Sequence, residues 1–294
     1  MSASTPDAGA TTGAGWQPSA RELARRRTRQ QQHRRRVLIA SVATVVVLGG
    51  LVAAVVLSPG WARVQATFLD PHHAKESLPA IAKGFWINVK MFLIAEPLIL
   101  VAGLALALIR QARSAWLVPV RGLAVVYTDV VRGIPTLLLV FLFAFGMPAL
   151  GLAGIPTSLF FWATVALVVS YSAYVAEVFR SGIESVHPSQ LASAEALALS
   201  RAQTMRYVVV PQAVRRVVPP LLNDFVSLQK DTALAASVGV FEALFAAADY
   251  GNYKFNFTAY VVAAAFFIAL TVPLARLCDA LTRRMARRER AGAL

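Results

Sequence analysis

Long apolar runs with almost no charged residues constrain this sequence more than any other feature. Residues 37–57 form a run of 21 residues without a charge. A helix needs roughly 20 apolar residues to cross a hydrocarbon core about 30 Å thick. Only 15% of the residues are charged, whereas about a quarter of the residues in soluble domains are charged. The sequence therefore predicts an all-α integral membrane protein.

Five further segments have similar length and hydropathy: residues 91–109, 134–152, 157–176, 232–250 and 257–275. Glu96-Pro97 interrupts the first of these five segments, and Glu242 and Asp249 lie in the fourth. Together with residues 37–57, they give about six predicted transmembrane helices.

Arginine and lysine lie in alternate loops between these segments. The N-terminus, residues 110–121, residues 180–216 and the C-terminus are basic, whereas the turn 151–156 is uncharged and the turn 251–256 holds only Lys254. Because basic residues accumulate in cytoplasmic loops, we expect both termini in the cytoplasm. The chain would then cross the membrane several times.

The formal net charge of +14 raises nucleic acid as a partner. The arginines, however, flank apolar runs and have no aromatic residues between them. We therefore predict contact with membrane lipid and none with nucleic acid. The single cysteine, Cys278, excludes an intrachain disulfide and a cysteine-based metal site.

The chain before the second apolar run has three predicted parts. They are a disordered basic cytoplasmic tail over residues 1–36, an extra transmembrane helix over 37–57 and an external interfacial segment over 58–83. The run 37–57 exceeds the roughly 7–15 residues of a cleaved signal peptide, so we expect it to be retained. His72-His73 can ligate a metal, but an adjacent pair in an exposed loop is usually solvated, so no metal site is predicted.

The stretch Arg180–Lys230 is long for a loop between spans. Its pattern predicts a first helix over residues 190–199, with Ser189 as N-cap, and a capping box in the sequence 200–203 that opens a second helix. Pro211 is predicted to end this second helix. Two short helices on the cytoplasmic face suit the docking of a soluble partner, although an ordinary pair of surface helices fits the periodicity equally well.

Four segments resemble the permeases of polar amino acid ABC importers: residues 127–136 (YTDVVRGIPT), 171–183 (YSAYVAEVFRSGI), 210–213 (VPQA) and 219–232 (PPLLNDFVSLQKDT). The resemblance covers residues 84–285. It implies a permease transmembrane domain with the core of a type I ABC importer, followed by a cytoplasmic tail over residues 286–294.

In that family, a cytoplasmic loop carries the motif E-A-A, followed after three residues by Gly, and its helices dock on an ATPase subunit. Residues 187–212 are the matching loop, with residues 192–194 (ASA) and Ala198 at the motif positions. The chain thus lacks both the glutamate and the glycine, and Glu195 is a candidate substitute for the missing charge. The resemblance implies ATPase-coupling roles for Gln190, Ala192, Ser193, Ala194, Glu195, Leu197, Ala198, Ser200 and Gln203. It implies gating or structural roles for Arg132, Pro135, Glu177, Arg180, Asn223, Lys230 and Asp231.

Ionisable groups inside membrane spans are costly and suggest function. Glu96 lies near the middle of its predicted span, where its carboxylate can meet a substrate ammonium or guanidinium. The alternative is a carboxylate paired with a neighbouring helix, or protonated in place. Glu242 and Asp249 lie nearer the outer half of their predicted span and are further candidates for the substrate path.

The sequence contains no G-x-x-x-x-G-K-[ST] phosphate loop and no familiar catalytic or metal-binding motif. We therefore predict a transport subunit that is not an enzyme and binds no cofactor, with ATP and Mg on a separate ATPase dimer. The resemblance also implies a second permease copy or sibling permease and an extracytoplasmic amino acid binding protein. The predicted function is import of polar amino acids. An ion-coupled secondary transporter or channel, a membrane enzyme and a membrane-anchored interaction protein are the alternatives.

Overall fold

A computed structural model describes residues 19–112 and 114–291, and all regular structure within these ranges is helical. The helices in chain order are α1 (Ala20–Val56), α2 (Trp61–Phe68), α3 (Pro71–Gln111), η1 (Ala115–Leu117), α4 (Val118–Gly133), α5 (Thr136–Phe141), η2 (Leu142–Gly146), α6 (Met147–Ala149), α7 (Leu159–Glu184), α8 (Pro188–Ala196), α9 (Arg201–Thr204), η3 (Met205–Val209), α10 (Val210–Asp231), η4 (Thr232–Val238), α11 (Ala243–Lys254) and α12 (Thr258–Ala291). The all-α fold predicted from the sequence is confirmed.

The chain divides into two units, residues 1–63 and residues 64–294. The first unit contains α1, which begins where Ser19 Oγ accepts a hydrogen bond from the Glu22 amide. The helix α1 runs without interruption to Val56 and therefore contains residues 37–56 of the apolar run 37–57. The predicted disorder is therefore wrong for residues 20–36, whereas residues 1–18 lie outside the described part of the chain.

Helix α3 is the longest helix of the second unit, and its 41 residues span about 60 Å. It begins at Asp70, whose Oδ1 accepts hydrogen bonds from the amides of His72 (2.8 Å) and His73 (3.4 Å). Such a cap satisfies amides that have no partner within the helix. The predicted interfacial segment therefore consists of the short helix α2 and the first turns of a helix that continues into the membrane span.

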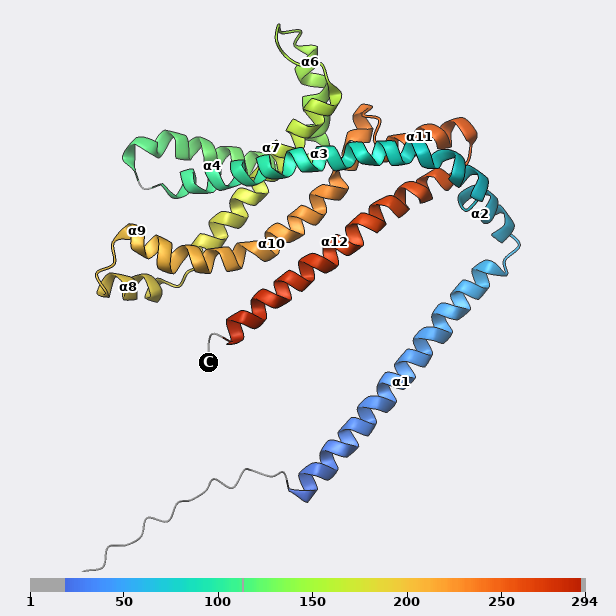
Figure 1. The fold of residues 1–294 in the computed structure, drawn as a ribbon, viewed down its shortest axis with the longest axis horizontal. Coiled ribbons are helices and arrows are strands. Elements are labelled where there is room, and N and C mark those ends of the chain that lie inside the picture. The colour runs from blue at the N-terminus through green and yellow to red at the C-terminus, as the bar shows by residue number, and fades with distance from the viewer. Residues whose placement is uncertain (1–18, 113, 292–294) are drawn as a thin grey trace, which may run out of the picture. The chain divides into compact units, whose positions relative to one another are not determined.

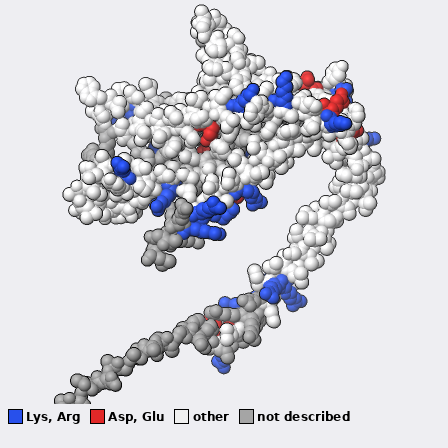
Figure 2. All heavy atoms as spheres, in the orientation of Figure 1, with Lys and Arg blue, Asp and Glu red and all other residues white. Residues whose placement is uncertain are grey.

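Four described helices are long and apolar enough to cross a membrane: Gln31–Val56, Trp61–Gln111, Leu159–Glu184 and Thr258–Arg287. Two bent pairs raise the count to six if each pair is one span: Ala115–Gly133 with Thr136–Ala149, and Ala202–Val238 with Ala243–Lys254. In the second unit, α8 and α9 lie at one end of the helix bundle and α11 lies at the other (Figure 1). Most of the visible surface is uncharged, as expected for helices in lipid (Figure 2).

The predicted span 134–152 is helical over Thr136–Ala149, which is too short to cross a membrane on its own. Its helical part meets α4 at an angle of 106°, with the break at Ile134 and Pro135. Ile134 has φ −100° and ψ 129°, because the ring of a following proline disfavours the helical conformation. The sequence 127–136 therefore marks a bend between two helices, and residues 118–133 are an additional helix that the prediction missed.

Most of the predicted cytoplasmic loop 180–230 belongs to the helix bundle. Residues 210–231 form α10, which packs against α7 and α12. Pro211 does not end the helix but lies in the first turn of α10, directly after the π-helical turn η3. Val209 and Val210 have helical backbone angles, so the helix continues from η3 into α10 and the proline lies next to a π-helical turn within it. Only residues 185–209 remain outside the packed helices.

The main core lies between α3, α7 and α10. Met91, Ile99 and Leu228 are at most 1% exposed. Gly103 allows α3 to approach α7 closely, because a Cβ at this position would lie 2.5 Å from Cγ1 of Val175. A smaller apolar cluster joins α3, α11 and α12. These contacts hold α3 at the centre of the second unit.

Candidate functional site

The loop predicted to dock on an ATPase forms two short helices, as expected. Helix α8 begins after His187, whose Nδ1 accepts a hydrogen bond from the Ser189 amide at 3.2 Å. The N-cap is therefore His187, and the prediction of Ser189 is wrong. The capping box of α9 is confirmed: the Ser200 amide donates to Gln203 Oε1 at 2.8 Å, and the Gln203 amide donates to Ser200 Oγ at 3.3 Å.

Ala198 occupies the position of the family glycine in a left-handed conformation, with φ +55°. The Leu199 amide donates to the Ala194 carbonyl at 3.0 Å, and the Ala198 amide donates to the Glu195 carbonyl at 2.9 Å. This pattern is a Schellman motif, which usually has glycine at the left-handed position. The turn that ends α8 thus has the backbone conformation that glycine usually adopts, and the Cβ of Ala198 strains it.

Replacing Ala198 by glycine is expected to stabilise this turn by about 1 kcal/mol, because glycine adopts a positive φ without the steric penalty of alanine. Amide hydrogen exchange over residues 188–204 should slow by roughly fivefold. Ala196→Gly is the matched control, since Ala196 is the last residue of α8 and glycine weakens a helix. Faster exchange in both variants would contradict the strain at Ala198.

Two hydrogen bonds attach the loop to α10. Gln212 Nε2 donates to Gln190 Oε1 at 2.7 Å, and Arg216 Nη1 donates to the Ser185 carbonyl at 2.5 Å. Within α8, Ala194 is buried, whereas the other predicted coupling residues of the loop are exposed: Gln190, Ala192, Ser193, Glu195, Leu197, Ala198, Ser200 and Gln203. The loop is therefore hydrogen-bonded to α10 and exposes most of the predicted coupling residues.

A cluster of ion pairs lies near the loop, at the ends of α3, α4 and α7. Glu177 Oε2 lies 3.3 Å from Nη1 of Arg110 and 3.8 Å from Nη1 of Arg132. Arg180 forms ion pairs with both Glu177 and Glu184. Three of the predicted gating or structural residues thus meet, and Arg110 and Glu184 are two further members that the sequence pattern did not single out.

Carboxylates from α3 and α10 gather near the middle of α7. Glu96 is partly buried and lies close enough to Asp224 for their charges to interact. Tyr171 donates a hydrogen bond of 2.7 Å to Asp231 Oδ2. Asp224 Oδ2 is buried and has no hydrogen-bond partner among the described residues. The sequence reasoning missed Asp224 and Tyr171, because their meeting depends on how α7 and α10 pack.

Asp231 lies at membrane depth, because its partner Tyr171 is near the middle of the 26-residue helix α7. Lys230 and Asn223 are exposed, and the bend at Pro135 is exposed too. The roles predicted for these residues remain predictions.

Glu242 is fully buried at the break between η4 and α11. Its Oε1 accepts a hydrogen bond of 2.9 Å from the Phe245 amide, so it caps α11. Asn88 supports the same break, since its Oδ1 accepts from the Ala243 amide at 3.1 Å and its Nδ2 donates to Thr232 Oγ1 at 3.1 Å. Asp249 is exposed on α11. The structure thus shows that Glu242 caps α11. The predicted place of Glu242 and Asp249 on the substrate path stays a prediction.

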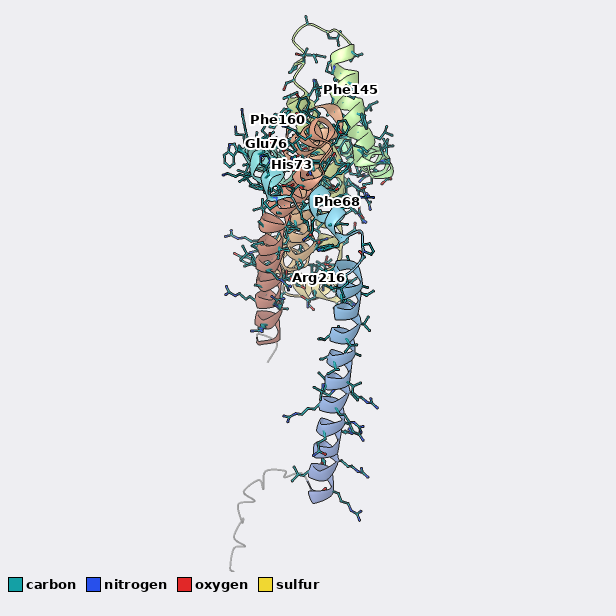
Figure 3. The ribbon with its side chains drawn as sticks, turned by 90° about the vertical axis from the view of Figure 1, so that its right-hand side faces the viewer. Phe68, His73, Glu76, Phe145, Phe160 and Arg216 are labelled. Carbon is teal, nitrogen blue, oxygen red and sulfur yellow. The ribbon has the colours of Figure 1, made fainter. Side chains whose placement is uncertain are left out.

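A polar cluster joins the first turns of α3 to α11 (Figure 3). His73 Nδ1 lies 2.8 Å from the Tyr250 hydroxyl, which donates to Glu76 Oε2 at 2.7 Å. Lys254 Nζ lies 3.0 Å from Glu76 Oε1. Ligand atoms of His72, His73 and Glu76 lie within 4.8 Å of one another and form a candidate metal group. Because Tyr250 and Lys254 already contact Glu76, we read the cluster as a link between α3 and α11.

Known proteins share this architecture. The family of inner membrane components of binding-protein-dependent transport systems matches residues 99–287. The probable glutamine ABC transporter permease protein GlnM of Bacillus subtilis is 32% identical over 203 residues, which are 69% of this chain and 91% of GlnM. The glutamate transport system permease protein GluC of Corynebacterium glutamicum is 31% identical over 219 residues, which are 71% of this chain and 95% of GluC.

Solved structures give the same result. A crystal structure of an amino acid ABC transporter with histidines matches with a TM-score of 0.64 and 30% identity, covering 70% of this chain and 94% of that chain. An inward-facing MetNI methionine ABC transporter matches with a TM-score of 0.56 at 17% identity, which supports the fold alone. The chain is therefore a multi-pass membrane permease subunit of the ABC importer type. It belongs to the family of inner membrane components of binding-protein-dependent transport systems.

Proposed function

We propose that this chain is the permease subunit of an ATP-driven importer of polar amino acids in a bacterial cytoplasmic membrane, with both termini in the cytoplasm. The observation that carries the proposal is the loop 187–212, a capped helix pair that is hydrogen-bonded to α10 and exposes Ala192, Ser193 and Ala198, three of the four residues that match the family motif. The printed functions of GlnM and GluC, glutamine and glutamate transport, support amino acids as the substrate class.

The family to which the chain belongs supports the proposed partners, and the sequence has no phosphate loop of its own. ATP and Mg would bind to a separate ATPase dimer, and α8 would dock on one of its subunits. A second permease copy or a sibling permease would complete the membrane pore, and an extracytoplasmic binding protein would deliver the amino acid. ATP binding would then favour one of two conformations of the permease pair, as a ligand shifts any two-state equilibrium.

Glu96 and Asp224 are the proposed contacts for the positive end of the substrate. Every free amino acid carries an ammonium group, and a carboxylate at membrane depth binds a cation more strongly than the same group in water. The unpartnered Oδ2 of Asp224 is available for a charge-assisted hydrogen bond.

Replacing Glu96 by glutamine is expected to raise the KM for amino acid uptake about tenfold, because a charge-assisted hydrogen bond is lost. Uptake of labelled glutamine, glutamate, arginine and histidine would be measured in proteoliposomes that contain the ATPase and the binding protein. Asp279→Asn is the control, since Asp279 is exposed on α12. An unchanged KM for every substrate would remove Glu96 from the proposed path.

The same preparation tests the function itself. We expect uptake only when ATP, the ATPase and the binding protein are all present. Uptake that is indifferent to ATP and follows an ion gradient would overturn the proposal in favour of an ion-coupled transporter.

A further inference from the structure

A pocket of about 480 Å³ opens beside the break between η4 and α11. Its walls come from α3, α7 and the break: Ile87, Lys90, Leu159, Phe160, Gly239, Val240 and Phe241. Figure 3 looks onto this end of the second unit and labels Phe160. The proposed transport function does not use this pocket.

Lys90 supplies the only charge in the pocket wall. Its side chain is exposed, and its Nζ lies 6.0 Å from the centre of the Trp86 ring. No carboxylate among the described residues forms an ion pair with Lys90. The pocket therefore combines an apolar interior with one unpaired ammonium group.

The position of Lys90 places the pocket at the level of lipid headgroups. Lys90 precedes Gln111, the last residue of α3, by 111 − 90 = 21 residues, which is roughly 31 Å of helix. This distance matches a hydrocarbon core about 30 Å thick. Since α7 runs from Leu159 at the pocket to Glu184 beside the coupling loop, the pocket lies at the membrane face opposite that loop. The side chain of Trp86 is 55% exposed, and tryptophan is enriched at this level.

Three amides at the break, those of Gly239, Val240 and Glu242, donate to carbonyls at 3.0, 3.2 and 2.7 Å. Backbone groups that are satisfied within the protein in this way can border an apolar environment. A polar amino acid would need several polar partners, whereas the side chains of the pocket offer only Lys90. The walls therefore favour an acyl chain over a transport substrate.

We propose that this pocket binds one anionic phospholipid, with the headgroup phosphate at Lys90 Nζ and one acyl chain along Phe160 and Phe241. The pocket complements both parts of such a molecule, since its charge is a single cation at headgroup depth and its walls are apolar. The bound lipid would lie against the break between η4 and α11.

The test uses the full chain in nanodiscs of phosphatidylcholine with added phosphatidylglycerol, and native mass spectrometry counts the phosphatidylglycerol that is retained. Wild type and Lys90→Arg should retain one molecule more tightly than Lys90→Ala, with affinity about fivefold lower in Lys90→Ala, since one lysine near an anionic headgroup has an effect of this size. Lys83→Ala is the matched control, because Lys83 is an exposed lysine two turns earlier on α3 and outside the pocket.

Three results would overturn the proposal. The first is equal retention in Lys90→Ala and Lys83→Ala. The second is displacement of phosphatidylglycerol by soluble glycerol phosphate at the same concentration, which would show that the acyl chain has no site. The third is efficient cross-linking of two copies through Phe160→Cys in a Cys278→Ser background, which would assign the pocket to a permease interface. Because the readout is lipid retention, each result is independent of whether the chain carries amino acids.

Discussion

Replacing Glu177 by alanine is expected to lower the free energy of unfolding by roughly 2–3 kcal/mol. The carboxylate is the shared partner of Arg110, Arg132 and Arg180, so its loss leaves three guanidinium groups facing one another. The Arg110 side chain is only 12% exposed, and a largely buried charge without its partner is strongly destabilising. Thermal unfolding of the purified chain in detergent measures the effect.

Glu184→Ala is the control for this prediction. The Glu184 side chain is 54% exposed and pairs only with Arg180, and exposed ion pairs contribute little. A similar loss of stability in both variants would mean that α3, α4 and α7 are not held together through Glu177.

Replacing Gly84 by alanine is expected to cost roughly 3 kcal/mol, the upper part of the range for overpacking. A Cβ at Gly84 would lie 2.6 Å from the carbonyl carbon of Glu242 and 2.8 Å from the amide nitrogen of Ala243. These are backbone atoms, so α11 itself would have to move away from α3. The melting temperature should fall, and cross-linking between α3 and α11 should weaken.

Gly122 on α4 provides the opposite case, because nothing lies within 4 Å of a Cβ at this position. Gly122→Ala should leave the fold intact and stabilise it by about 0.5–1 kcal/mol, since alanine favours a helix. If both substitutions had the same effect, the close approach of α3 and α11 would be refuted.

The contacts described above connect the loop 187–212 with the helix break between η4 and α11. The loop is bonded to α10 through Gln212 and Arg216, and α10 ends at Asp231, which Tyr171 holds against α7. The helix then continues through η4 to Gly239, where it breaks. We expect a displacement of α8 to reach the break through α10, and double-mutant cycles between α8 and the break would measure this coupling.

The sequence allowed prediction of features that depend on local pattern. Apolar runs predicted the membrane helices, and Ser200 with Gln203 predicted a cap that forms as expected. The prediction failed for α10, because Pro211, Pro219 and Pro220 make a membrane-associated helix look like a loop. The sequence pattern also could not show the bend of 106° at Ile134-Pro135, since a proline marks a helix boundary but does not fix the angle between the two helices.

The candidate site was predictable only in part. Glu96 stood out because a carboxylate in an apolar run is costly, but Asp224 and Arg110 acquire their significance from packing between helices distant in sequence. Glu242 shows the opposite case, since the charge that suggested a substrate contact caps α11 at a helix break. A charge in a span can therefore indicate a structural contact as well as a substrate.

The most direct test of the account is the coupling of ATP hydrolysis to uptake across the loop 187–212. Both rates would be measured in the same proteoliposomes, with the ATPase and binding protein, for wild type, Ala198→Asp and Ser114→Asp. Aspartate tolerates the left-handed conformation at position 198, so the first variant adds charge to the docking face without new strain, and Ser114 is an exposed control outside the loop. We predict that Ala198→Asp loses stimulated hydrolysis and uptake together while Ser114→Asp keeps both. Full uptake by Ala198→Asp would contradict the assignment of this loop as the ATPase docking site.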